Sequence, residues 1–110
     1  MTRRHSATEA GLPAEIVRAL ASVGVRALRL NSGSLRVGNR CVRLCPAGTP
    51  DLLVIDPYLW IECKRRDGKG ELSPEQIEFR DWCASRGVPW CEVKSVGEAV
   101  RAVNEERARR

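Results

Sequence analysis

Two acids and a lysine in one short stretch of the chain have the side chains needed to bind a metal ion and cleave a phosphodiester bond. Asp51 begins an apolar run, and Glu62 and Lys64 stand two residues apart after a turn. Mg²⁺ takes oxygen ligands and is held by one or two carboxylates, the other positions being filled by water and phosphate. Such a metal generates a nucleophilic hydroxide, and a nearby ammonium stabilises the developing charge. The spacing predicts a hard-cation site with a cationic neighbour.

Residues 48–64 are predicted to form two strands joined by a turn, with Asp56 and Pro57 in the first two positions of a type I turn. Side chains alternate along a strand, so Glu62 and Lys64 share one face and Cys63 points to the other. If Asp56 pairs with Leu59, Asp51 lies opposite Lys64 and diagonal to Glu62. A two-residue loop places Asp51 opposite Glu62 instead, whereas a three-residue loop without a bulge separates the acids.

Two further groups are expected near this pair of strands. The main-chain carbonyl of Cys63 is a third metal-ligand candidate, and Gln76 has an amide suited to holding a water or a phosphate oxygen. Each feature also has a purely structural interpretation. Glu62 and Lys64 could form a solvent-facing ion pair, and Gln76 fits a capping box with Ser73. The combination favours a site, because a mid-strand acid and lysine are costly to bury unless they are paired or bound to metal.

Composition describes one soluble globular domain of 110 residues, with residues 1–8 and 105–110 expected to be frayed tails. The net charge of +5 comes largely from arginine, which supplies 16 of the 19 basic residues. Arginine suits phosphate recognition, so a polyanionic partner is plausible, although a bland basic surface is about as common. No apolar stretch approaches the length of a membrane span, and we expect a cytoplasmic protein in a bacterium or a phage-infected host cell.

The five cysteines do not have the spacing of a metal site. They are odd in number and contain no Cys-x-x-Cys pair, and the single histidine, His5, falls in the expected tail. Structural zinc is therefore disfavoured, and most of these cysteines are expected to be small buried hydrophobic residues.

The remaining elements follow from periodicity and from start and stop signals. A helix is predicted from Pro13 to Gly24, its apolar side including Val23, and a strand from Val25 to Leu30. Residues 35–37 and 40–44 read as a tight hairpin. Ser73 and Gly87 bound a second helix, residues 89–93 form a strand, and Ser95 with Glu98 opens a last helix. The four residues Tyr58, Trp60, Trp82 and Trp90 could lie in the core or on a dimer surface, and the core is expected for most of them. The order predicts an α/β sandwich around a mixed sheet.

Pro50-Asp51 followed by Glu62-Cys63-Lys64 resembles the signature of the PD-(D/E)xK nucleases. The flanking segments 31–33, 48–52, 61–65 and 72–76 resemble the VRR-NUC branch, particularly its short stand-alone phage and bacterial members. The resemblance runs from about Glu15 to about Val100. It implies a restriction-endonuclease-like αβββαβ sandwich, in which a central mixed sheet is flanked by helices.

The resemblance also implies residue roles. Asp51 and Glu62 match the metal ligands, Lys64 the catalytic lysine and Gln76 a supporting residue of the active site. Glu15 matches an acid on the first helix, which would be a further metal ligand, and Glu9 is the competing choice. Basic residues at the loops and the hairpin are candidates for contacting DNA: Arg36, Arg40, Arg43, Arg65, Arg66 and Lys69.

The implied activity is Mg²⁺- or Mn²⁺-dependent hydrolysis of DNA by an endonuclease. Small members are similar to Holliday-junction resolvases and act as homodimers on branched DNA. The chain has no room for a separate base-reading module, which favours recognition of shape and phosphates. Two alternatives stay open: a non-catalytic nucleic-acid-binding module that keeps the fold, and a restriction-type nuclease acting on linear duplex.

Overall fold

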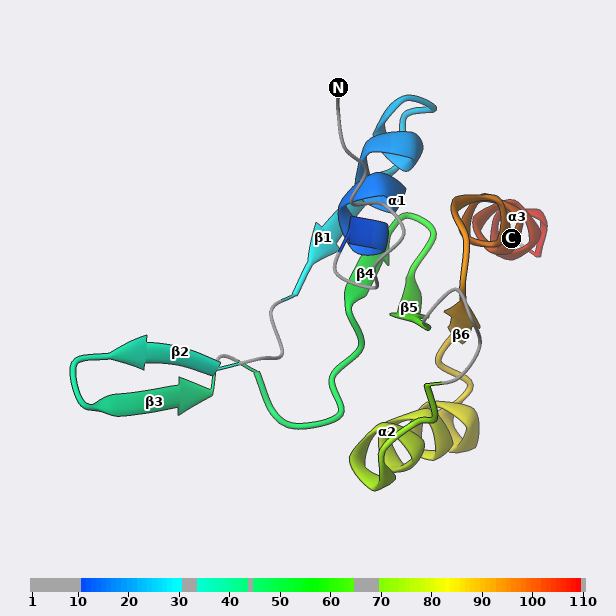
Figure 1. Cartoon of the computed structure of the whole chain (residues 1–110). Helices are drawn as coiled ribbons and strands as arrows, with labels where there is room; N and C mark the ends of the chain where they lie inside the picture. The colour runs from blue at the N-terminus through cyan, green and yellow to red at the C-terminus, as the bar shows by residue number, and fades with distance from the viewer. Residues whose placement is uncertain (1–10, 31–33, 44, 65–69, 110) are drawn as a thin grey trace.

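The structure, a computed structural model, describes residues 11–30, 34–43, 45–64 and 70–109 (Figure 1). Its elements are, in chain order, α1 (Gly11–Ala21), β1 (Arg26–Arg29), β2 (Ser34–Val37), β3 (Arg40–Arg43), β4 (Leu52–Ile55), β5 (Leu59–Cys63), α2 (Pro74–Arg86), β6 (Trp90–Val93) and α3 (Val96–Ala108). The predicted succession of helix, strand, two hairpins, helix, strand and helix is confirmed. The described chain is therefore of mixed α/β class.

A four-stranded mixed sheet with the order β1-β4-β5-β6 forms the centre of the molecule. β1 pairs antiparallel with β4, and β4 antiparallel with β5, whereas β5 and β6 run parallel. Parallel neighbours need a long crossover connection, which here contains α2. β2 and β3 form a separate two-stranded sheet, the cyan-green hairpin that stands away from the four-stranded sheet in Figure 1.

One face of the sheet carries the hydrophobic core, beneath α1 and α3. Alternation along the strands directs one set of side chains to this face. The main core residues from the helices are Leu12, Ile16, Leu20, Ala99 and Val103, and those from the strands are Val25, Ala27, Leu52, Val54, Leu59, Ile61, Cys63 and Val93. Cys63 is 1% exposed in this cluster, as expected for a small buried hydrophobic residue.

The opposite face is covered by α2 over only part of its width. The rings of Trp60 on β5 and Phe79 on α2 meet edge to face, with centroids 5.1 Å apart. Trp90, which pairs with Trp60 in the sheet, is half-buried like it. The expectation that most aromatic residues are in the core is wrong for Tyr58 and Trp82, which are 60% and 48% exposed. This face therefore combines an apolar patch with the polar residues considered below.

The start and end of α2 are those that the sequence predicts. The Ser73 hydroxyl accepts a hydrogen bond from the main-chain N–H of Gln76, and the side-chain oxygen of Gln76 accepts one from the Ser73 N–H. Gly87 ends the helix in the left-handed region, with φ of 69°. The capping box fixes Gln76 in the first turn of α2, next to the sheet.

Two local predictions are wrong. α1 ends at Ala21, two residues before Val23, which is 61% exposed instead of facing the core. The turn between β4 and β5 is not of type I, because Asp56 has a φ of 58° and its bond to Pro57 is cis. The observed register, with Val54 opposite Leu59, is that of a two-residue loop.

None of the helices among the described residues is long and apolar enough to cross a bilayer.

The core predicts how strongly unfolding depends on one central side chain. Ile61 is fully buried on β5, so Ile61→Ala should lower the free energy of unfolding by about 2–5 kcal/mol through lost burial and the cavity left behind. Urea titration followed by circular dichroism measures this difference. The control Val23→Ala removes an exposed side chain and should cost less than about 1 kcal/mol. Equal losses in the two variants would contradict the assigned core.

Candidate metal centre

The two predicted acids meet where β4 begins and β5 ends. Leu52 pairs with Ile61, so the register continued by one residue places Asp51 across from Glu62, on the sheet face that bears α2. This is the two-residue-loop alternative of the sequence analysis. Glu62 is 5% exposed, which is unusual for a carboxylate in the middle of a strand.

Pro50 and Asp51 change the hydrogen bonding at the end of the β4–β5 ladder. The same register places Pro50 across from Cys63, and proline has no N–H to donate to that ladder position. The Cys63 N–H instead donates to Asp51 Oδ2 at 2.8 Å. Because the N–H and C=O of one strand residue project from the same edge, the Cys63 carbonyl also faces the Asp51 side. Two carboxylates and a carbonyl therefore converge at this edge of β5.

Gln76 connects α2 to the buried acid. Its Oε1 accepts from the Ser73 N–H at 2.7 Å, and its Nε2 donates to Glu62 Oε2 at 3.0 Å. The sequence presented helix capping and support of the site as alternative roles for Gln76. The Gln76 side chain fills both roles. The amide therefore fixes one oxygen of the Glu62 carboxylate.

A glycine allows the start of α2 to approach the loop that leads into β4. Gly48 has a φ of 91°, and a Cβ at this position would collide with the backbone carbonyl of Glu75. The same loop is braced by Thr49, whose hydroxyl donates to the Pro46 carbonyl at 2.7 Å. Because Asp51 follows this loop and Gln76 follows Glu75, the close approach holds the two site residues at a fixed separation.

Lys64 lies beside an acid that the sequence analysis missed. Its Nζ is 3.7 Å from Glu92 Oε2, and the two side chains are 34% and 27% exposed. Glu92 pairs with Glu62 across the parallel strands β5 and β6, so both face α2. The signal was present in the sequence as an acid inside the predicted strand 89–93. A partly exposed pair of this kind adds little stability, and its effect is to orient the lysine.

A polar cavity of about 230 Å³ opens beside these groups. Its lining residues are Glu62, Cys63, Lys64, Gly70, Glu71, Leu72, Gln76 and Glu92. The cavity gives Lys64 and the Gln76 amide access to solvent from the same side. A small anionic group could therefore reach both of them together.

Burial raises the pKa of Asp51 above its ordinary value of 3.8. The Cys63 N–H, a hydrogen bond to the Glu62 carboxyl and the charge of Arg29 oppose this rise without cancelling it. Asp51 and Glu62 therefore meet in a buried setting that disfavours the charged form of Asp51, and a divalent cation is one means of neutralising the two acids.

This donor set fits Mg²⁺ or Mn²⁺ held partly by the protein. The residues that would hold the ion are Asp51, Glu62 and the Cys63 carbonyl, which leaves positions for water and phosphate. No group of three or more His, Cys, Asp or Glu side chains suited to a metal ion occurs within the described ranges. Oxygen donors such as Asp51, Glu62 and the Cys63 carbonyl fit a hard cation better than they fit a structural zinc site, which takes nitrogen and sulfur ligands.

The remaining predicted residues are not brought to this cluster by the contacts seen. Glu15 is half-buried on α1, which packs on β1 and α3, and the polar cavity has no α1 residue in its lining. Arg40 is exposed at the start of β3, and Arg36 and Arg43 lie on the same hairpin by register. The predicted residues Glu9, Arg65, Arg66 and Lys69 lie outside the described residues.

Comparisons of the chain with protein-family models, with curated proteins and with solved structures find no match.

The raised pKa of Asp51 predicts a pH-dependent cost in the metal-free protein. A folded pKa above the unfolded one gives stability that is present below about pH 3.8 and lost as the pH rises through the folded value. Asp51→Asn removes this titration and can still accept the Cys63 hydrogen bond. In EDTA, the melting temperature of Asp51→Asn relative to wild type should therefore rise between pH 4 and pH 8. Asp56→Asn, in the exposed turn, controls for loss of charge alone, and a gap that stays constant with pH would refute the expectation.

The close approach of Gly48 to α2 predicts that a side chain added at this position lowers the free energy of unfolding. Gly48→Ala should lower the free energy of unfolding by about 1–3 kcal/mol for the left-handed backbone and by a similar amount for the clash with Glu75. Gly24→Ala is the matched control, because Gly24 has a φ of 81° and nothing within 4 Å of an added Cβ. The difference between the two variants in the free energy of unfolding, measured by urea titration, gives the cost of the clash with Glu75 alone. No difference would mean that the loop and helix do not need to touch.

Proposed function

We propose that this chain is a Mg²⁺- or Mn²⁺-dependent endonuclease that hydrolyses phosphodiester bonds in DNA. The observation that carries the proposal is the convergence of the Asp51 and Glu62 carboxyl groups and the Cys63 peptide at one edge of β5. Two converging carboxylates in a partly buried setting need a compensating charge, and the chemistry of these donors fits a hard divalent cation. When bound, such a cation polarises the phosphodiester and lowers the pKa of a water ligand.

The residues of the chain then have distinct roles. Lys64 extends from the strand that carries Glu62, where its ammonium can balance negative charge that develops on phosphate. Glu92 holds that ammonium 3.7 Å away at the edge of the cavity. Gln76 keeps Glu62 oriented through its 3.0 Å hydrogen bond, so the acid does not turn toward solvent. Strands and a capped helix, rather than flexible loops, position all four groups.

The arrangement also supports a restriction-endonuclease-like fold of VRR-NUC type. The Asp51, Glu62 and Lys64 spacing resembles the family signature, and the mixed sheet with helices on both faces is compatible with its αβββαβ plan. In this proposal Glu15, half-buried on α1, is the acid that the resemblance assigns to the first helix. Its distance from the two central acids is the feature that a metal-bound structure would measure.

We propose branched DNA, of the Holliday-junction kind, as the substrate and a homodimer as the acting species. The net charge of +5 and the exposed Arg40 favour a phosphate-rich partner. Cutting two strands symmetrically requires two sites, which one chain of this size does not contain. This DNA-cutting chemistry belongs in the cytoplasm of a bacterial or phage-infected cell.

The alternatives differ in what they require of the acids. A non-catalytic DNA-binding module would need the basic surface but no cation at Asp51 and Glu62. The convergence of these carboxyl groups favours the catalytic hypothesis, because a simple binder gains nothing from two converging buried acids. A restriction-type nuclease would use the same site and would cut linear duplex at particular sequences.

Removing the lysine should abolish cleavage while leaving the fold and the cation affinity in place. Lys64→Ala should lower the cleavage rate of a labelled four-way junction in Mn²⁺ by about 10²–10³-fold. Lys94→Ala removes an exposed lysine directly after β6 and should cut at the wild-type rate. Single-turnover assays on junction, flap and linear duplex give the rates and the preferred substrate. Equal cutting by wild type and Lys64→Ala would overturn the assignment.

Calorimetry of Mn²⁺ binding separates the nuclease from the binding module. Glu62→Gln should keep the fold, because Gln76 can still pair with an amide oxygen, and should bind Mn²⁺ much more weakly than wild type. Wild-type protein that binds DNA but gives no Mn²⁺ heat would favour the non-catalytic module. Unfolding of Glu62→Gln would identify Glu62 as a structural residue instead.

A further inference from the structure

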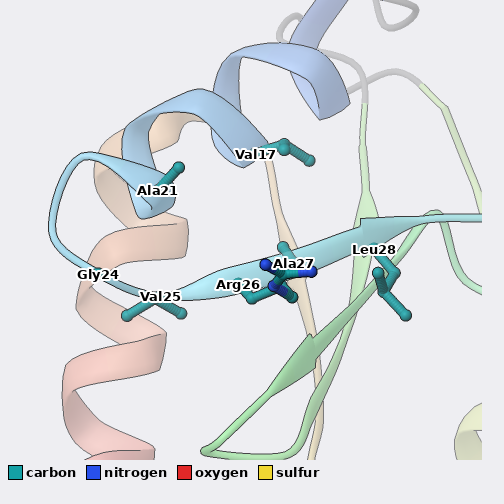
Figure 2. Close-up of a pocket in the computed structure, with 7 residues that line it drawn as sticks. All are labelled: Val17, Ala21, Gly24, Val25, Arg26, Ala27 and Leu28. Carbon is teal, nitrogen blue, oxygen red and sulfur yellow. The ribbon is translucent and has the colours of Figure 1, made fainter.

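A groove runs along the β1 edge of the sheet, near the end of β4 opposite to the acid cluster. Among the strands that the structure describes, β1 pairs with β4 alone and is an edge strand. Figure 2 shows the groove between the end of α1, which contributes Val17 and Ala21, and the chain from Gly24 to Leu28. Its volume is about 460 Å³, within the roughly 300–1,000 Å³ range of ligand pockets. Apart from Arg26 the side chains that line it are apolar.

The edge presents a peptide group ready for a new strand. The Leu30 N–H donates to the Asp51 carbonyl at 2.8 Å, so alternate residues of β1 bond to β4 and the residues between them point outward. Val25 is one of these, and its N–H donates to the Leu20 carbonyl at the end of α1. Ala27 is the next, and within the described ranges no backbone group bonds its outward peptide.

The two sides of this edge differ in chemistry. On one side of β1 stands the α1 wall of Val17 and Ala21. On the other side are Leu28, which is 40% exposed, and Arg26, because these two residues pair with Leu53 and Ile55 on the face that bears α2. Side chains of an added strand would alternate between the same two sides. The groove therefore fits a strand that alternates small aliphatic residues with acidic ones.

Two other polymers could occupy the groove, a second copy of this chain and nucleic acid. The charges and the apolar wall of the groove argue against both. A second copy pairing its β1 antiparallel to this one would offer Arg26 no acid, because residues 25–30 contain two arginines and no carboxylate. The hairpin of a second copy carries three arginines and no acid between residues 34 and 43. Nucleic acid would meet the charge of Arg26 but leaves the apolar α1 wall unfilled.

We propose that the β1 edge is a docking site for an extended acidic peptide segment of another protein, which adds to the sheet as a fifth strand. The peptide backbone bonds the outward peptide of Ala27, aliphatic side chains fill the space beside Val17 and Ala21, and a carboxylate pairs with Arg26. This mode of recognition takes affinity from the main chain and specificity from alternate side chains. It is independent of the metal centre, which lies at the other end of β4.

A synthetic peptide tests the proposal directly. The probe is a fluorescein-labelled hexapeptide of alternating glutamate and valine, followed by fluorescence anisotropy with the full chain. Saturable binding is expected, with amide chemical shifts moving at residues 25–28. Arg26→Glu should weaken it at least about tenfold through charge reversal, whereas Arg101→Glu, on exposed α3 surface, should leave it unchanged. Ala21→Trp, at an exposed helix position, should block the groove without unfolding the protein.

Other results would overturn the proposal. These are the absence of saturable binding up to about 1 mM, equal affinity for wild type and Arg26→Glu, or equal binding of a hexapeptide of alternating lysine and valine. Sedimentation that shows a dimer lost in Arg26→Glu would assign the edge to a second copy. Displacement of the peptide by a single-stranded oligonucleotide would assign it to nucleic acid.

Discussion

The amide of Gln76 connects the capped end of a helix to a buried acid, and the candidate site depends on this link. One end of the amide satisfies the Ser73 N–H of α2, and the other donates to Glu62 on β5. The helix cannot shift along the sheet without breaking a capping bond or exposing the carboxylate. Gly48 adds a second restraint, because its missing side chain lets the loop before β4 reach the backbone at Glu75. Both ends of the acid pair are therefore held by the same helix start.

This rigidity has an electrostatic consequence. Two carboxylates brought together out of solvent repel one another, and the raised pKa of Asp51 shows that burial outweighs the bonds that favour its anion. A protein gains no stability from such a pair, since a well-packed hydrophobic pair would cost less. In the proposed function, a bound cation would neutralise the two acids and offset this cost. Pro50 contributes to the same end, since the ladder stops where Asp51 takes the Cys63 N–H.

Local signals predicted the elements that rest on local chemistry. Ser73, Pro74 and Gln76 announce the start of α2, and the observed capping box agrees with them. The meeting of Asp51 and Glu62 followed from strand alternation, but the register depended on the loop between the strands, and residue preferences favoured a type I turn that does not occur. Val23 fits a helical apolar stripe, yet α1 stops before it because the chain must turn into β1. Neither outcome is encoded within a few residues.

Glu92 shows why the rest of the site could not be predicted. Its place beside Lys64 depends on β6 pairing parallel to β5 in the register that sets Glu92 against Glu62. A parallel pairing is made through a crossover, so no turn between the two strands fixes it, and a shift of one residue would turn Glu92 to the core face. The packing of Trp60 against Phe79, and its pairing with Trp90, opposes that shift because a slipped β6 would bring Cys91 to the α2 face. The aromatic packing on this face therefore sets the register of β6, and this register places Glu92 beside Lys64.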